Sequence, residues 1–123
     1  MKITDLVGYQ LVDLNENEII VQKDEKRFLI EIEDDFGDCC GYNNIKAHLY
    51  IGDEVKRNPI ITDISKENEE TDCSDKCCIT FFGEDKILAK LETESSSGSG
   101  WCYGAAVTLN CKNLKIDEVL SEW

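Results

Sequence analysis

Short segments in which apolar and polar residues alternate constrain the fold of this 123-residue chain more than any other feature. In Arg27–Glu33 a phenylalanine and two isoleucines occupy every second position, and the opposite face carries glutamates. Ile45–Ile51 and Lys86–Glu94 repeat this period of two. Because successive side chains of a β-strand point to opposite faces, the pattern predicts half-buried strands of an antiparallel sheet.

Other segments are strand-like in composition and are separated by polar turns and loops. These further expected strands are Tyr9–Leu14, Ile19–Gln22, Ile60–Ile64, Cys77–Phe82 and Tyr103–Cys111. Loops are expected at Asp34–Asn44, Gly52–Pro59 and Ser65–Lys76, and a tight turn at Gly83–Asp85. Residues 1–7 are expected to form a short helical or irregular lead-in.

The end of the sequence has a different period. Apolar residues stand at positions 116, 119, 120 and 123, which is helical spacing, so Leu114–Trp123 predicts a short amphipathic helix. The predicted fold is therefore mainly β, an antiparallel sheet or small β-sandwich or barrel of about seven or eight short strands, with a mixed α+β class as the alternative. With 41% hydrophobic residues, residues 1–123 are expected to form a single domain.

The charge balance restricts the partners. The chain has 26 acidic and 13 basic residues and a net charge of −13, which disfavours direct binding to nucleic acid or to an anionic membrane. The carboxylates form either solvated faces or a mimic of a polyanion. The apolar runs, of about four or five residues, are far shorter than a membrane span or a signal peptide needs. We therefore expect an intracellular protein with reduced thiols.

Seven cysteines are many for such a chain, and the odd number does not suit a closed disulfide framework. If Cys77 and Cys78 lie in one strand, their thiols point to opposite faces and cannot easily share a metal ion. The Cys73–Cys77 spacing is not that of paired zinc knuckles. Packed reduced thiols, some disulfide and zinc binding remain three alternatives, and no metal site or cofactor is predicted.

No motif predicts an enzyme. His48 is the only histidine, and no nucleophile-elbow motif accompanies it. Asp34, Asp35 and Asp38 do not have the spacing of an EF-hand loop, so they are interpreted as turn residues that cap the backbone.

Two segments have the composition of ligand-binding loops. Ser95–Gly104 combines glycines and serines with two large aromatic residues, and Cys39–Asn44 has a related composition. Backbone N–H groups and hydroxyls of such loops can bind an anion, while aromatic rings stack on a base. The alternative interpretation is a flexible hairpin connection. The candidate ligand-binding residues are Ser97, Gly98, Ser99, Gly100, Trp101, Tyr103, Cys39, Tyr42 and Asn43.

The order of several motifs resembles a family of small phage and prophage proteins of unknown function. The motifs are Asp38-Cys39-Cys40 with Asn43 and Ile45, then Asn58-Pro59-Ile60-Ile61, Ile79–Gly83 and Ser97–Gly104. The resemblance covers roughly residues 8 to 111. This chain differs from many members around Gly52–Asn58 and in its additional Cys73, Cys77 and Cys78.

The resemblance implies a phage accessory protein in the host cytoplasm that acts against host defence without being an enzyme. One hypothesis is a sponge that sequesters a nucleotide-derived small molecule, with Lys46, Lys90 or Arg57 neutralising its charge. Binding at a subunit interface would make such a protein a homo-oligomer. The first alternative is an acidic mimic of nucleic acid that inhibits a host protein, with Glu67, Glu69, Glu70 and Asp72 as candidate residues. The second is a structural or regulatory accessory protein without a ligand.

Overall fold

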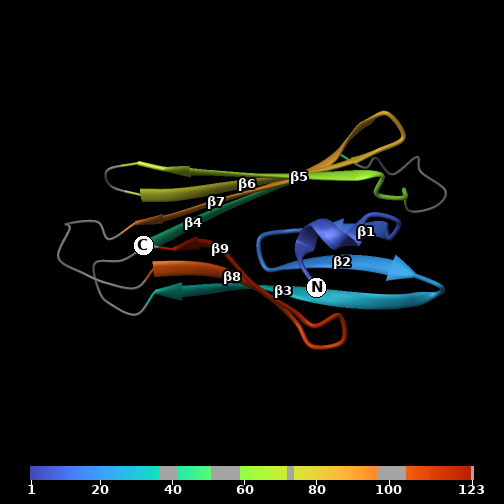
Figure 1. Cartoon of the computed structure of the whole chain (residues 1–123), viewed down its shortest axis with the longest axis horizontal. Coiled ribbons are helices and arrows are strands. Elements are labelled where there is room, and N and C mark those ends of the chain that lie inside the picture. The colour runs from blue at the N-terminus through green and yellow to red at the C-terminus, as the bar shows by residue number, and fades with distance from the viewer. Residues whose placement is uncertain (37–41, 51–58, 72–73, 97–104, 123) are drawn as a thin grey trace.

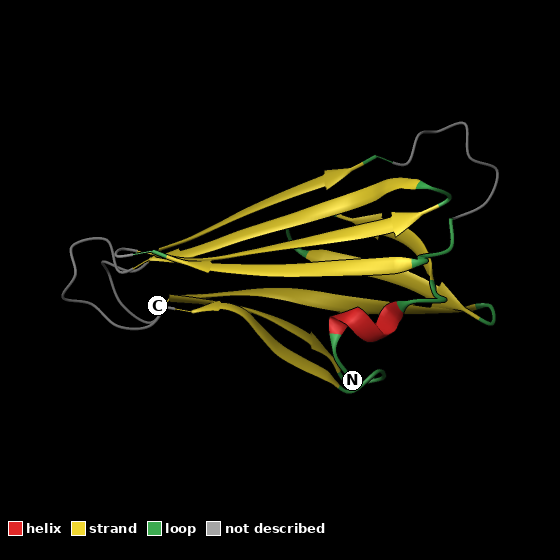
Figure 2. Ribbon diagram, turned by 45° about the horizontal axis from the view of Figure 1, so that its top comes forward, coloured by secondary structure: helices red, strands yellow, loops and turns green. Residues whose placement is uncertain are grey.

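The chain folds into two layers of antiparallel β-sheet (Figures 1 and 2). The computed structural model describes residues 1–36, 42–50, 59–71, 74–96 and 105–122. Within these ranges a 3-10 helix, η1 (Ile3–Leu6), precedes nine strands. The strands are β1 (Gln10–Leu14), β2 (Glu18–Lys23), β3 (Lys26–Phe36), β4 (Tyr42–Leu49), β5 (Asp63–Glu70), β6 (Ser74–Gly83), β7 (Lys86–Ser96), β8 (Ala105–Cys111) and β9 (Ile116–Glu122).

The two sheets have the strand orders β1-β2-β3-β8-β9 and β4-β7-β6-β5. All paired strands are antiparallel. The chain leaves the five-stranded sheet after β3, builds the four-stranded sheet, and returns at β8. The predicted mainly β antiparallel fold is thus confirmed as an open sandwich, and the described strands do not close into a barrel.

The core lies between the layers, as the alternation predicts. Ile79, Phe81 and Leu91 of the four-stranded sheet are fully buried. Ile30 and Leu109 are buried on the facing side of the five-stranded sheet. Burial of each such side chain stabilises the fold by about 1.5–3 kcal/mol, so the inward faces hold the layers together.

The prediction of a C-terminal helix is wrong, because residues 116–122 form β9 at the edge of the five-stranded sheet. The register with β8 shifts between Val107 and Thr108, and this β-bulge places an extra residue in β9. The extra residue, Leu120, is buried, and Val119 faces outward with 46% exposure. The helix-like spacing therefore arises because Val119 is apolar on the outer face and Glu118 takes an inward position between Ile116 and Leu120.

The polar loop expected at Ser65–Lys76 is also largely strand. β5 continues to Glu70, and β6 already begins at Ser74. Because β5 is an edge strand, its charged side chains remain solvated while its backbone pairs with β6. The loop expected at Asp34–Asn44 is likewise shortened, since β3 runs to Phe36 and β4 starts at Tyr42.

Smaller features agree with the sequence. The lead-in contains η1, and Gly83–Lys86 is a tight hairpin turn. A Cβ atom at Gly83 would lie 2.4 Å from the carbonyl oxygen of Ile60, so only glycine fits where this segment crosses the hairpin. Among the described residues, no helix has the length and apolar character needed to cross a membrane.

Candidate functional site

The two predicted ligand-binding segments leave the sandwich at the same end. Phe36 at the end of β3 pairs with Ala105 at the start of β8, and Tyr42 at the start of β4 pairs with Ser96 at the end of β7 (Figure 1). The stretches 37–41 and 97–104 therefore connect neighbouring strand ends. Of the predicted ligand residues, Cys39, Ser97, Gly98, Ser99, Gly100, Trp101 and Tyr103 lie outside the described residues. Tyr42 is described only as part of the backbone of β4.

Asn43 connects the strands that carry these segments. Its Nδ2 donates to Asp34 Oδ1 at 2.6 Å and to the carbonyl oxygen of Ala106 at 3.0 Å. Its Oδ1 accepts a hydrogen bond from Ser95 Oγ at 2.6 Å. One amide thus ties β4 to β3, β7 and β8 at the predicted binding end. Asp34, expected in a turn, is instead a strand residue that accepts one of these bonds.

A buried chain of hydroxyls continues from Asn43 between the sheets. Ser95 Oγ lies 2.7 Å from Ser121 Oγ, which accepts a hydrogen bond from Thr93 Oγ1 at 3.0 Å. All three hydroxyl residues are buried. Because the polar groups satisfy one another, the end of the sandwich can be polar inside without unpaired groups.

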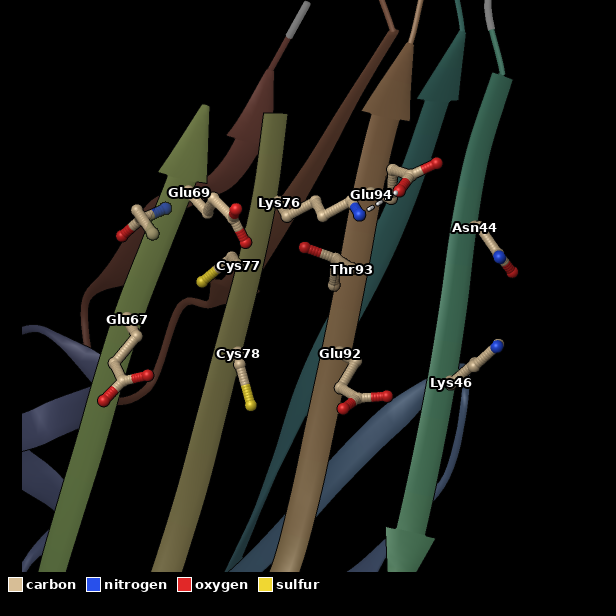
Figure 3. Close-up of a pocket in the computed structure, with 11 residues that line it drawn as sticks. Asn44, Lys46, Glu67, Glu69, Lys76, Cys77, Cys78, Glu92, Thr93 and Glu94 are labelled. Atoms are coloured by element: carbon tan, nitrogen blue, oxygen red, sulfur yellow. Dashed lines mark ion pairs between the residues drawn. The ribbon is translucent and has the colours of Figure 1, made fainter. Parts of the chain in front are cut away.

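A shallow pocket of about 390 Å³ lies on the outer face of the four-stranded sheet (Figure 3). It extends over two adjacent rows of side chains. Within each row, the side chains are cross-strand neighbours on the four strands. In the order β4, β7, β6, β5 these rows are Asn44, Glu94, Lys76 and Glu69, and then Lys46, Glu92, Cys78 and Glu67. The first row begins two residues from the strand ends at Tyr42 and Ser96, so the pocket adjoins the predicted binding end.

The pocket mixes positive and negative side chains. Lys76 Nζ lies 3.4 Å from Glu94 Oε2, and His48 Nε2 lies 3.9 Å from Glu92 Oε2. Within the described ranges, Lys46, Glu67 and Glu69 form no ion pair. Lys90, also predicted to neutralise a ligand, lies on the same face opposite His48, and Arg57 lies outside the described residues.

The vicinal cysteines point to opposite faces, as predicted. Cys78 is partly exposed in the pocket, whereas Cys77 is 3% exposed and faces the other sheet. Burial raises the pKa of the Cys77 thiol to about 11, with Lys66 opposing the shift. Cys77, Cys78 and Cys111 are free thiols, and no cluster of three or more metal-binding side chains occurs among the residues described. Cys39, Cys40, Cys73 and Cys102 lie outside them.

The outer face of the five-stranded sheet has a different character. Five carboxylates of β2, β3 and β9 lie on it, and none of these five forms an ion pair with a side chain in the described part of the chain. This acidic face consists of Glu18, Glu31, Glu33, Asp117 and Glu122. Glu18 lies directly opposite Glu31, a like-charge pair that costs stability.

The sequence named Lys46 and Lys90 as candidate cations for a ligand but did not predict the pocket. Asn44, Lys76, Cys78, Glu92 and Glu94 meet only through the register of β4, β6 and β7. Their alternation within each segment was visible, but the pairing of distant strands was not. No protein-family model, curated protein or solved structure matches this chain.

Proposed function

We propose that this protein is a non-enzymatic binding protein that sequesters a nucleotide-derived small molecule in the pocket of the four-stranded sheet. The observation that carries the proposal is the position of this pocket. It lies two residues from the strand ends that bear both segments with ligand-loop composition. A volume of about 390 Å³ is in the range of small-molecule sites.

The chemistry of the lining supports a ligand of this kind. Lys46 and Asn44 offer donors to phosphate oxygens, and Glu67 and Glu69 offer acceptors to hydroxyl or amino groups. A nucleotide carries both kinds of group. The adjoining segment 97–104 has an indole and a phenol ring in its sequence, which suit stacking on a base.

The test is isothermal titration with cyclic di- and trinucleotides and with linear and cyclic ADP-ribose derivatives. Replacing Lys46 by methionine should weaken binding of the active compound by about tenfold or more, because a hydrogen bond to a charged group is lost. Lys26→Met, at the start of β3 in the other sheet, is the matched control and should bind like the wild type. If no compound binds, or if both variants behave alike, the proposal fails.

The resemblance to phage proteins suggests the biological role. A phage protein that sequesters a nucleotide signal in the host cytoplasm would prevent that signal from activating host defence. This role requires stoichiometric binding and no turnover. Recovery of the bound compound chemically unchanged after denaturation of the complex would support it, and recovery of a converted product would contradict it.

The acidic face favours a second candidate function, mimicry of nucleic acid toward a basic host protein. Its five carboxylates have no cationic partner among the described residues, although such partners would stabilise the sheet. The Glu18–Glu31 pair even opposes folding. A surface that is kept acidic at the expense of stability suits a basic partner.

This candidate predicts opposite effects on folding and on binding. The double variant Glu18→Gln/Glu31→Gln should be more stable by about 0.2–1 kcal/mol, since a like-charge pair is removed. The same variant should bind an arginine-rich peptide more weakly in fluorescence anisotropy, with the difference lost at high salt. Asp24→Asn/Glu25→Gln changes the net charge equally but lies in the β2–β3 turn, and serves as the control. Equal weakening by both variants would show that only net charge matters.

A further inference from the structure

The lining residues at the two edges of the pocket, on β4 and on β5, differ in charge. The two lining residues on β4, Asn44 and Lys46, offer donors, and neither is acidic. The two outward lining residues on β5, Glu67 and Glu69, are both acidic (Figure 3). Because β4 and β5 are the two edges of a four-stranded sheet, three strand spacings of about 4.8 Å put them roughly 14 Å apart.

The strands between these edges carry charges of both signs, with Glu92 opposite Lys46 and Lys76 opposite Glu69. Lys76 on β6 and Glu94 on β7 neutralise each other at 3.4 Å. On the β4 side of Glu92, His48 Nε2 lies 3.9 Å from its Oε2, and Lys46 is its cross-strand partner. No cation within the described ranges pairs with either carboxylate on β5, and no carboxylate pairs with Lys46. At the two edges themselves, the pocket therefore has a lysine on β4 and two carboxylates on β5.

We propose that the pocket binds its ligand in one orientation, with an anionic group at Asn44 and Lys46 and an amino group at Glu67 and Glu69. This inference rests on the proposed function and specifies its ligand as a molecule with an anionic group at one end and a hydrogen-bond-donating amino group at the other. A phosphate at the β5 edge would face two carboxylates, which repel it. An adenine nucleotide, with a phosphate and an exocyclic amine at opposite ends, meets both requirements.

The orientation is tested with three probes, namely adenosine 5′-monophosphate, adenosine, and inosine 5′-monophosphate, in which a carbonyl replaces the amine. Lys46→Met should weaken the binding of adenosine monophosphate by about tenfold. It should change the affinity for adenosine by less than about twofold, because only the phosphate contacts Lys46. The wild type should prefer the adenosine to the inosine nucleotide. Glu67→Gln/Glu69→Gln should lose that preference, since a glutamine amide can donate to the carbonyl.

The outcomes separate the two proposals. If the wild type binds neither adenosine monophosphate nor adenosine at millimolar concentration, this inference fails, whereas the proposed function fails only if the cyclic nucleotides and ADP-ribose derivatives do not bind either. The proposed orientation is wrong, and the binding function stands, in either of two cases in which the wild type binds adenosine monophosphate. In the first, Lys46→Met weakens the binding of adenosine as much as that of adenosine monophosphate. In the second, Glu67→Gln/Glu69→Gln still prefers the adenosine to the inosine nucleotide. Circular dichroism and thermal unfolding of each variant, with Lys26→Met as control, show whether a loss of affinity is a loss of fold.

Discussion

Adjacent residues of β6 have opposite environments, and their position in the strand is the reason. Cys77 faces the other sheet and is buried, whereas Cys78 faces the pocket and is partly exposed. Side chains one position apart in a strand lie on different faces, so two identical thiols acquire different chemistry. The thiolate is the reactive form, which makes Cys77 a packing residue and leaves Cys78 accessible.

The raised pKa of Cys77 predicts a loss of stability in alkali. Below about pH 9 the thiol is protonated in both the folded and the unfolded state. Between about pH 9 and 11 the unfolded thiol ionises while the folded one keeps its proton, so the free energy of unfolding falls. The contribution at pH 11 is about 2 kcal/mol. Between pH 8 and 11, the free energy of unfolding measured with urea should fall less steeply for Cys77→Ala than for the wild type. Parallel curves for the two proteins would contradict this assignment.

The hydroxyl chain between the sheets predicts non-additive mutations. Ser121→Ala leaves the buried Thr93 hydroxyl without its acceptor and should cost about 1–3 kcal/mol. Thr93→Val removes the other partner of the same bond. The double variant should cost less than the sum of the single variants by about 1 kcal/mol, because no unpaired donor remains. Urea unfolding of the four proteins measures this, and additivity within about 0.5 kcal/mol would show that the bond contributes little.

At the scale of the elements, two hairpins turn without glycine at their tips. Asp24 and Glu25 in the β2–β3 turn have φ values of 52° and 66°, and Glu84 and Asp85 in the β6–β7 turn have 53° and 61°. Two consecutive positive φ values characterise a type I′ turn, whose twist matches that of paired strands. The left-handed region costs a residue with a side chain about 1–2 kcal/mol. The hairpins therefore form because strand pairing overcomes strained turns.

This strain predicts a stabilising substitution. Glu25→Gly creates the Asp-Gly sequence that type I′ turns favour. The entropy that glycine loses on folding offsets part of the relieved strain, so the free energy of unfolding should rise by about 0.5–1 kcal/mol. Glu16→Gly is the matched control, because Glu16 lies in a loop without a positive φ. It should be neutral or destabilising in thermal unfolding, and an equal gain in both variants would point to removal of charge instead.

At the scale of the whole molecule, polar contacts close one side of the open sandwich. Lys66 Nζ on β5 lies 2.5 Å from Glu118 Oε2 on β9, and Glu118 Oε1 accepts a hydrogen bond from the backbone N–H of Ile3. Asn68 Nδ2 donates to the carbonyl oxygen of Leu120 nearby. An edge of each sheet and η1 thus meet at one ion pair. Side-chain exposures of 24% and 11% make it far less hydrated than the Lys76–Glu94 pair.

The two ion pairs should therefore differ in their effect on stability. Lys66→Met leaves the shielded Glu118 carboxylate without its cation and should cost about 2–4 kcal/mol. Lys76→Met, in a pair with side-chain exposures of 48% and 29%, should cost less than about 1 kcal/mol. Urea unfolding at low and high salt measures both. Similar costs, or a strong salt dependence for Lys66→Met, would mean that water reaches the Lys66–Glu118 pair freely.

Sequence patterns alone predict the β class, the inward face of most strands and the opposite directions of Cys77 and Cys78. These properties depend on the alternation of side chains, which is local and has a period of two. Lys46 was predicted to neutralise a ligand for the same reason, since its charge and outward face are visible in its own segment. The ligand role of the nine candidate residues stays a prediction, namely that of Cys39, Tyr42, Asn43, Ser97, Gly98, Ser99, Gly100, Trp101 and Tyr103.

The pairing of the strands is visible only in the folded chain. β9 is a strand because it completes the edge next to β8, and the bulge at Leu120 is invisible to a search for periodicity. β5 extends through a polar sequence because β6 supplies its backbone hydrogen bonds. The pocket and the acidic face arise from registers between residues distant along the chain. Strand pairing is non-local, so no single segment contains the information that places Lys46 and Glu67 in one site.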